Sequence, residues 1–528
     1  MRNRFLAALI LAAFSTGAVA VQPKISIGDT HTLLLKSDGT VWAWGSNSSY
    51  QLGIEGGSTG TPTQIPNFTG VVDVVAKPGG FSMALKADGT VWVWGNVSSG
   101  QAADCVSCGG NFVSVPYKVP SVQQMVSIAA TSNGYTVLAV DSVGQAWSWG
   151  EGGSGELGDG LTTDRVTPQK ISGVTNVASI SASNQAVMAL RSDGSLMGWG
   201  YNGNGSTQDN MLAGKLGANI ITPTVLNVPS VVSADAIHMN TSGQFFGLTT
   251  AGTPLIWGDT NSGLINCNQL AGGTNIIQPY TPTGLSGIRQ IAGGDSYALF
   301  LNQNGQVLGC GGNTHGELGD GTLISTGFSN VPTKPGPVMT GGLPTSLLSI
   351  AAGTYSSAAL DTLGGVYTWG RASGGLSGQG DGTSPTVNTT AVKLSINAGA
   401  AASAPAIFSG TQSGPLSNAT VDVGIAVAPA HVGQTGQVYI AIVLPDSTGT
   451  ILLLNSSGAF VPYSPGSPIT ARYSGLLPKI LPLNLVRDTN LTSFSGTSVI
   501  MGYGLGSGTA ADADMLSNGR LSSLLQLQ

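Results

Sequence analysis

The sequence predicts an all-β protein: a seven-bladed β-propeller followed by a small β-sandwich-like C-terminal domain. The first observation is the stretch from Leu33 to Gly45, LLLKSDGTVWAWG, which recurs in recognisable form six more times. The second is its spacing, because the final glycines of the copies are 50, 55, 50, 58, 53 and 59 residues apart. The third is that all nine tryptophans fall into two columns of these copies. Self-similarity at such a period is typical of propellers and solenoids.

Two glycines, six residues apart, mark each copy. The outer glycines are Gly45, Gly95, Gly150, Gly200, Gly258, Gly311 and Gly370. The inner glycines are Gly39, Gly89, Gly144, Gly194, Gly252, Gly305 and Gly364. In four copies the inner glycine follows an aspartate or asparagine, a pair that favours a tight turn with positive φ. We therefore expect a β-hairpin turn at each inner glycine.

The strands on either side of this turn have distinct patterns. The strand before it has large apolar residues on one face and small ones on the other, which is typical of a strand buried on both sides. The strand after it places a large residue directly before the outer glycine: Trp44, Trp94, Trp149, Trp199, Trp257, Cys310 and Trp369. A short apolar strand precedes this hairpin and a proline-flanked strand follows it, which gives the four strands of a propeller blade. The tryptophans are therefore predicted to be packing residues rather than ligand sites.

Residues 27–53, IGDTHTLLLKSDGTVWAWGSNSSYQLG, are similar to the repeat of the regulator of chromosome condensation family. Residues 152–160 (GGSGELGDG) and 313–321 (NTHGELGDG) match the glycine-rich turn of that repeat. The resemblance covers about residues 25–397 and implies a seven-bladed propeller. Copies four and five depart most from it, and the histidine common in the family survives only as His31. The founding member exchanges nucleotide on a small GTPase and touches chromatin in the nucleus, and that activity is not carried over with the fold.

The predicted domain organisation has four parts. Residues 1–20 have the basic start, short apolar run and small-residue end of a secretory signal peptide. Residues 21–397 are the propeller, 398–418 an Ala/Gly/Ser/Pro-rich linker, and 419–528 the sandwich-like domain. The chain end is similar to a C-terminal module of secreted proteobacterial proteins. We therefore expect a bacterial protein exported to the periplasm or the extracellular space, without membrane insertion.

Composition argues against several classes of partner. Charged residues are 8% of the chain, against about 25% in ordinary soluble domains. The net charge is −6, and the 19 lysines and arginines form no cluster. Nucleic-acid binding needs a concentrated positive footprint, and attachment to an anionic membrane surface needs a polybasic patch. Neither is expected here.

The four cysteines suit an exported protein. Cys105 and Cys108 form a CxxC motif, for which a local disulfide is favoured over a metal or redox site because further ligands and a βαβ context are missing. Cys310 takes the place of a packing tryptophan and is expected to be a buried free thiol. A disulfide between Cys267 and Cys310 is the alternative.

No catalytic, cofactor-binding or metal-binding residues are predicted. The histidines, His31, His238, His315 and His431, have no ligand spacing. Carboxylates recur in the glycine-rich turns, where they are expected to cap the turn, with calcium binding as the alternative: Glu156, Asp159, Glu317, Asp320 and Asp381. A nucleophile elbow needs a following helix, and no helical pattern is evident.

The predicted function is that of a secreted, non-enzymatic protein that binds another protein through loops on one propeller face. The long polar loops 201–222 and 259–282 favour this, because loops on a rigid scaffold often bind partners, although they also fit tolerated insertions. The alternative is binding of a carbohydrate or a cell surface, as in a lectin or an adhesin. An enzyme working in the central channel is the third possibility.

Overall fold

The structure is a computed structural model of the whole chain. It describes residues 21–103, 105, 111–132, 135–182, 185–202, 219–229, 231, 238–239, 244–258, 276–325, 338–380, 386–400, 406–413, 415–428, 431–445, 450–463, 469–517 and 520–528. The predicted signal peptide, Cys108, Cys267, Asp381 and most of the two long loops lie outside these residues. No helix in the described part is long and apolar enough to cross a membrane.

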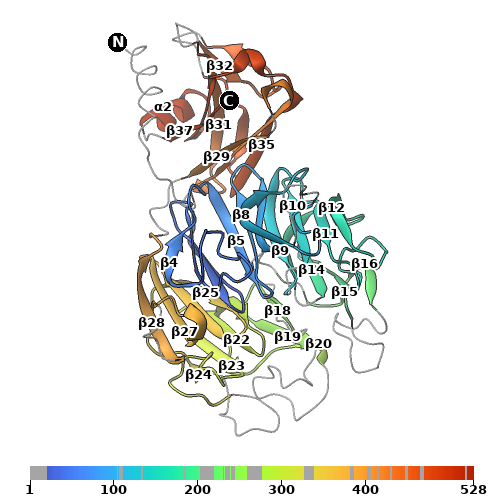
Figure 1. Cartoon of the computed structure of the whole chain (residues 1–528), viewed down its shortest axis with the longest axis vertical. Coiled ribbons are helices and arrows are strands. Elements are labelled where there is room, and N and C mark those ends of the chain that lie inside the picture. The colour runs from blue at the N-terminus through green and yellow to red at the C-terminus, as the bar shows by residue number, and fades with distance from the viewer. Residues whose placement is uncertain are drawn as a thin grey trace.

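Seven four-stranded antiparallel sheets follow one another along the described chain, one for each sequence copy (Figure 1). The strands of the first four sheets are β1 (Lys24–Ile27), β2 (His31–Leu35), β3 (Val41–Gly45), β4 (Thr59–Gln64); β5 (Val71–Lys77), β6 (Phe81–Lys86), β7 (Val91–Asn96), β8 (Phe112–Lys118); β9 (Met125–Ala130), β10 (Thr136–Asp141), β11 (Ala146–Gly150), β12 (Arg165–Lys170); β13 (Val177–Ala182), β14 (Ala186–Arg191), β15 (Leu196–Gly200) and β16 (Ile220–Val225). Those of the other three are β17 (His238–Met239), β18 (Gln244–Leu248), β19 (Pro254–Gly258), β20 (Ile276–Tyr280); β21 (Ile288–Gly293), β22 (Tyr297–Asn302), β23 (Val307–Gly311), β24 (Val338–Met339); β25 (Leu347–Ala352), β26 (Ser356–Asp361), β27 (Gly365–Arg371) and β28 (Val387–Asn397).

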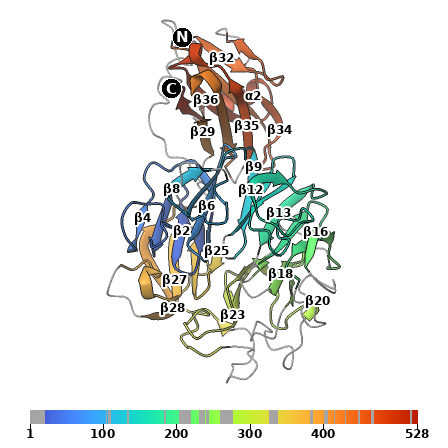
Figure 2. The same cartoon turned by 45° about the vertical axis from the view of Figure 1, so that its right-hand side comes forward.

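The sheets pack face to face around a ring, as in a β-propeller. Each buries the apolar residues of its two middle strands against its neighbours, since one four-stranded sheet cannot cover both of its own faces. The ring closes where the last sheet meets the first (Figure 2). There Ile25 and Leu34 of the first sheet share one cluster with Ala358 and Leu360 of the last. The all-β class and the propeller are thus as the sequence predicts.

Beyond the propeller, residues 406–528 form a separate C-terminal unit of two sheets. The smaller has β29 (Ile407–Ser413), β30 (Ala419–Ala426) and β35 (Ile480–Thr489). The larger has β31 (Thr435–Val443), β32 (Ile451–Leu454), β33 (Phe460–Pro462), β34 (Tyr473–Leu476), β36 (Ser498–Leu505) and β37 (Leu521–Gln526). Alternate residues of β30, β31 and β36, such as Val423, Ile440 and Met501, share one hydrophobic cluster between the sheets.

Three expectations for this unit are wrong. The predicted linker 398–418 contains β29, which pairs with β30 over seven residues, because its alternation is hidden within a glycine- and serine-rich stretch. The helix α2 (Thr509–Ser517) lies in a chain for which no helix was expected. Its alanines and aspartates fit a helix, but they carry no clear apolar stripe for a pattern to detect. The sequence of residues 469–473 also predicts a strand, but the strand in this region, β34, begins only at Tyr473.

Candidate functional site

The residues marked by the repeat belong to the two middle strands of each sheet and to the turn that joins them. Each of the fourteen inner and outer glycines has a positive φ, between 72° and 112°. The outer glycines also leave no room for a side chain. A Cβ atom at Gly95 would lie 2.1 Å from the carbonyl oxygen of Gly80, and one at Gly150 would lie 2.1 Å from that of Tyr135. Tight packing and backbone conformation therefore both require glycine at the outer position.

The tryptophans before the outer glycines fasten neighbouring sheets together. All six are almost fully buried. In five of them the indole N–H donates to the carbonyl of the residue six positions after the outer glycine of the preceding copy: Trp44 to Leu376 (3.1 Å), Trp94 to Gln51 (2.9 Å), Trp149 to Gln101 (2.8 Å), Trp199 to Glu156 (2.8 Å) and Trp369 to Glu317 (2.7 Å). We call these five bonds the indole clasps. They have a structural role, and the bond from Trp44 to Leu376 joins the first copy to the last.

The side chains at the accepting positions cap their own loops. Gln51, Gln101 and Glu156 each accept a hydrogen bond from the backbone N–H two residues earlier, at 2.8–2.9 Å. Glu317 does the same for the N–H of His315. Asp159 pairs with Arg165, and Asp320 accepts from Asn313 and Thr322. In the described residues no three His, Cys, Asp or Glu side chains form a group that could hold a metal ion.

His31 takes part in a hydrogen-bond network between the first two sheets. His31 is buried, and its Nε2 lies 2.9 Å from Ser82 Oγ, which in turn donates to the Gln51 carbonyl. Burial lowers the pKa of His31 to about 3. Tyr297 takes the position of His31 in the sixth copy and makes the equivalent contact with Ser357. His31 is thus a neutral residue of the contact between sheets.

The free thiol expected at Cys310 is wrong, because Cys310 is part of a disulfide. Cys310 is also buried, at the position where the other copies have tryptophan. A half-cystine is small and apolar, so it fits this place in the core. Cys105 is part of a disulfide as well. Its expected partner, Cys108, lies outside the described residues.

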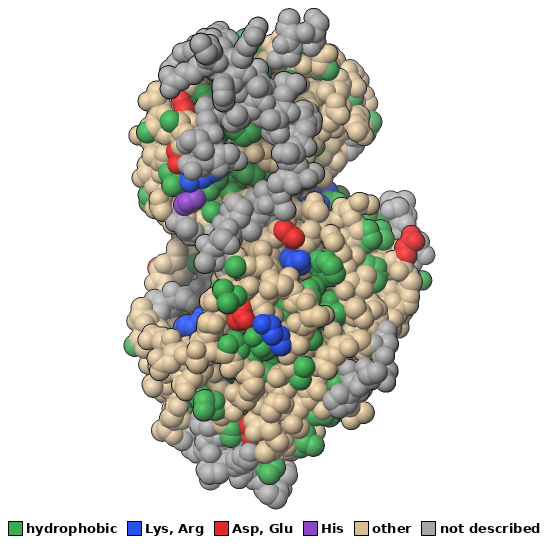
Figure 3. Space-filling model, turned by 90° about the vertical axis from the view of Figure 1, so that its left-hand side faces the viewer, with side chains coloured by type: hydrophobic (Ala, Val, Ile, Leu, Met, Phe, Trp, Pro, Cys, Tyr) green, Lys and Arg blue, Asp and Glu red, His purple; other side chains and the backbone are tan. Residues whose placement is uncertain are grey.

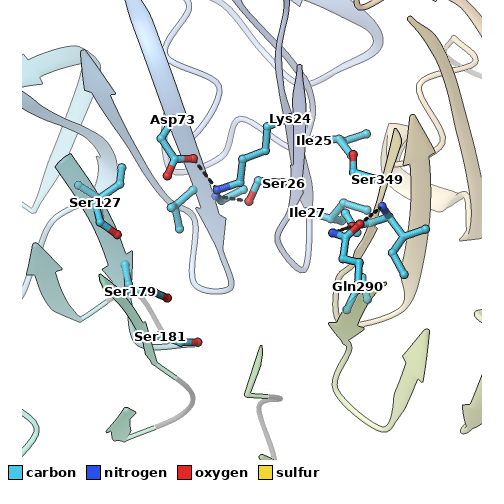
Figure 4. Close-up of a pocket in the computed structure, with 18 of the residues that line it drawn as sticks. Lys24, Ile25, Ser26, Ile27, Asp73, Ser127, Ser179, Ser181, Gln290 and Ser349 are labelled. Carbon is cyan, nitrogen blue, oxygen red and sulfur yellow. Dashed lines mark hydrogen bonds and ion pairs between the residues drawn. The ribbon is translucent and has the colours of Figure 1, made fainter. Parts of the chain in front are cut away.

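A central channel lies between the first strands of the sheets and has a volume of about 700 Å³. Its wall is formed by the first strand of six sheets and by part of the C-terminal unit. At one level of the wall, three of the six side chains are serines, and the others are an ion pair and an amide (Figure 4): Lys24, Asp73, Ser127, Ser179, Gln290 and Ser349. Because so many of these side chains are small, the channel stays open.

The charged groups of the channel are largely engaged with the wall. Lys24 Nζ lies 2.5 Å from Asp73 Oδ1, and Arg289 donates to the carbonyls of Leu347 and Leu348. Burial and, to a smaller extent, Lys24 lower the pKa of Lys77 to about 8. The described lining holds no histidine and no two carboxylates on adjoining strands. These channel residues are not among the residues singled out from the sequence. The run of small residues in the first strand of each copy could have indicated them.

The two ends of the ring differ. We call the end with the inner-glycine turns the turn face, and the opposite end, from which the chain leaves each outer glycine, the loop face. The C-terminal unit packs on the turn face: Lys118 Nζ lies 3.2 Å from the buried carboxylate of Asp422, and Asp88 accepts hydrogen bonds from Ser409 and Thr411. Lys479 and Ile480 of this unit line the channel. The channel is therefore covered on the turn-face side.

Comparisons with known proteins agree with this architecture. A family model for the regulator of chromosome condensation (RCC1) repeat matches residues 24–51, 177–206 and 288–317. A second model of the RCC1 repeat matches residues 38–85 and 143–190. Together the two models match residues 24–85, 143–206 and 288–317, and these parts of the chain are similar to RCC1 repeats.

Relatives with RCC1 repeats match only part of this chain. It is 28% identical over 155 residues to the RCC1 domain-containing protein RUG3, mitochondrial, of Arabidopsis thaliana, which is 29% of this chain and 34% of RUG3. It is 29% identical over 151 residues to the human E3 ubiquitin-protein ligase HERC2, which is 28% of this chain and 3% of HERC2. The matches thus span about a third or less of these relatives.

Among solved structures, human WBSCR16 has the same fold, with a TM-score of 0.52 and 21% identity over 66% of this chain and 88% of that chain. Yeast RCC1 (Prp20), crystallised bound to Kap60, matches with a TM-score of 0.38 and 24% identity over 70% of this chain and 75% of that chain.

Proposed function

We propose that this chain is a secreted, non-enzymatic scaffold that binds another protein through the loop face of a seven-bladed propeller. The observation that carries the proposal is the position of the C-terminal unit, which occupies part of the turn face through Asp88, Lys118 and Asp422. The loop face, at the other end of the strands, remains for a partner. RCC1 repeats favour the same role, since propellers with this repeat generally serve in binding or as exchange factors.

The finer parts of the proposal rest on the sequence. The seven sheets are taken as the seven blades of one propeller, and the two C-terminal sheets as a β-sandwich that serves as an accessory or docking module. Residues 1–20 support export, so the working place is the periplasm or the extracellular space. No nucleic acid is proposed as a partner, because the chain has a net charge of −6 and no basic cluster.

A comparison of the two faces tests this function. Leu161 and Leu323 are exposed apolar residues beyond outer glycines, on the loop face, whereas Val143 and Leu363 are exposed at inner-glycine turns, on the turn face. The full chain would serve as bait for the secreted proteins of its own producing cells. Leu161→Asp combined with Leu323→Asp should abolish capture of the partner, and Val143→Asp combined with Leu363→Asp should leave it intact.

Either reversal of that pattern would refute the choice of face. Export is tested separately by sequencing the N-terminus of the protein recovered outside the cytoplasm, where Val21 is expected as the first residue. A protein that keeps residues 1–20 and stays with the cytoplasmic fraction would refute the secreted role.

The second candidate function is the binding of a carbohydrate or a cell surface. One observation favours it, because Tyr50 and Phe112 are both exposed and their rings lie together at the loop face. Charged side chains are also sparse on the face shown in Figure 3, as neutral glycan binding would allow.

A further inference from the structure

Tyr50 departs from the repeat at a position that is otherwise always glycine. It lies five residues after the outer glycine of the first copy. The other six copies have Gly100, Gly155, Gly205, Gly263, Gly316 and Gly375 there. The four of these glycines that the structure describes as left-handed, Gly100, Gly155, Gly316 and Gly375, have φ between 78° and 85°. The fold therefore requires a left-handed backbone conformation at this position.

Tyr50 keeps that backbone conformation, with a φ of 61°. A bulky side chain in this region is unusual, because its Cβ atom crowds the neighbouring carbonyl oxygen. Such strain persists only where the surrounding structure enforces it, and it is concentrated at binding sites. Glycine adopts this backbone conformation in other copies without strain, so a tyrosine is not required for the fold at this position. We therefore look for a role of its ring outside folding.

The ring of Tyr50 forms an exposed pair with Phe112 of the next sheet. The ring centroids are 6.4 Å apart and the planes are inclined at 59°. Tyr50 is 45% exposed and Phe112 is 44% exposed. In other copies the glycine instead lies against the outer strand of the next sheet, with Gly100 against Val166 and Gly155 against Ile221. We call Tyr50 and Phe112 the aromatic platform.

Neutral hydrogen-bonding side chains surround the aromatic platform. Ser46 is half-buried and Ser48 is exposed, and their hydroxyl groups form a hydrogen bond of 3.1 Å. Asn96 is the strand partner of Phe112, and its side-chain amide is at the surface. The stretches 46–54, 94–100 and 111–117, which carry the platform and its surroundings, contain no charged residue.

We propose that the aromatic platform is a binding site for a neutral glycan. A pyranose has an apolar face of C–H groups, which packs on the electron-rich face of an aromatic ring, and a rim of hydroxyl groups, which hydrogen-bond to serine and asparagine. A protein partner would instead call for a contiguous apolar core with arginine or methionine among the aromatic residues. This site rests on the second candidate function, the binding of a carbohydrate, and names the ligand class and the residues for it; it does not depend on the protein-binding function.

Titration calorimetry of the full chain with cellohexaose, maltohexaose and mannohexaose tests the proposal. At least one of these neutral hexaoses should bind, and Phe112→Ala should weaken that binding at least tenfold. Tyr50→Phe keeps the ring and should stay within threefold of the original affinity. Tyr50→Gly restores the residue of the other copies and should weaken binding at least tenfold while the melting temperature stays equal or rises.

Ala103→Gly is the matched control. Ala103 also has a positive φ, 53°, at a position where four other copies have Gly53, Gly158, Gly319 and Gly378, but it is outside the platform. Its replacement should leave glycan affinity unchanged. The proposal is overturned if none of the three hexaoses binds, if Tyr50→Gly binds as the original chain does, or if the platform variants change only the capture of a protein.

Discussion

At the residue scale, the most informative position is the one whose carbonyl accepts an indole clasp. Its side chain is glutamine in the first two copies and glutamate in the third and sixth, yet each caps the same turn. Burial raises the pKa of Glu156 to about 7, with a smaller contribution from Glu151 and Asp164. The neutral form of this side chain therefore suits the folded protein better than the ionised form.

Glu156→Gln should stabilise the protein at neutral pH. Since the folded pKa lies above the ordinary pKa of 4.5 for a glutamate, this side chain makes the folded state less stable as pH rises from about 4.5 to about 7. Removal of this ionisation should raise the free energy of unfolding by about 1–3 kcal/mol at pH 8. Urea unfolding at pH 5 and pH 8 measures it. The reciprocal change, Gln51→Glu, should destabilise the protein at pH 8 and serves as the control.

His31 gives the opposite dependence on pH. Its folded pKa of about 3 lies below the ordinary pKa of 6.5 for a histidine, so below pH 6.5 the unfolded chain takes up a proton that the folded chain does not. Stability should fall as the pH drops from 6.5, by about 2 kcal/mol at pH 5. His31→Phe, which copies Phe81 of the second copy, should remove this slope from unfolding curves measured between pH 7 and pH 5. An unchanged slope would mean that His31 is not the group responsible.

At the scale of the sheets, the indole clasps join each strand carrying a tryptophan to the loop of the preceding copy. Trp149→Ala should cost about 3–5 kcal/mol, because it removes a fully buried side chain and its bond to the Gln101 carbonyl. Trp147 lies in the same strand but is half-buried, so Trp147→Ala should cost clearly less. Thermal unfolding of the two variants gives the comparison, and equal losses would argue against the clasp.

Gly144→Val tests the hairpin turn of the third sheet. The φ of Gly144 is 79°, and a Cβ atom there would lie 3.1 Å from the Cα atom of Asn176. A branched side chain should therefore lower the melting temperature, by several degrees for a loss of about 2 kcal/mol. Val143→Ala, next to it and fully in solvent, should have no effect. A Gly144→Val variant as stable as the parent would mean that the turn can adopt another conformation.

The sequence predicts these sheets well because each has the same signals in the same order. The two glycines and the tight turn recur in every copy, and the tryptophan before the outer glycine in all but the sixth. Such repetition is far beyond what chance would produce. The C-terminal unit has no repeat, so its prediction depends on alternation within single strands. The strand β29 and the helix α2 were missed for this reason, since glycine and serine in one and alanine and aspartate in the other leave no periodic apolar pattern.

The candidate sites were less accessible to prediction than the fold. The channel residues Lys24, Asp73 and Lys77 come from sequence positions that are unremarkable in each copy alone, and only the ring brings them together. Tyr50 could have been noticed as the exception to six glycines. Its exposure and its contact with Phe112 required the structure, because the two residues are on different sheets.

At the scale of the whole molecule, the C-terminal unit is fixed to the turn face by buried polar contacts. Lys118 also donates to Ser413 at 2.7 Å, and Gly424 lies so close to the backbone of Ala87 that a Cβ atom would be 1.8 Å from its carbonyl oxygen. Gly424→Leu should therefore separate the unit from the propeller without unfolding either. Small-angle scattering should show a larger radius of gyration, and limited proteolysis should cut faster between 398 and 406. Gly153→Leu is the control, because a Cβ atom there meets nothing within 4 Å and Gly153 does not have a positive φ.

The bond from Trp44 to Leu376 spans 332 residues of chain. While the chain is made from its N-terminus, the first sheet has no neighbour on one of its sides until the last sheet has formed. Until then Leu34 and Trp44 have no partner on that side, and long-range closure of this kind is slow and prone to aggregation. The newly made chain is thus at greatest risk until the last sheet, which ends at Asn397, has been made, and a chaperone that shields the first sheet would matter most until then.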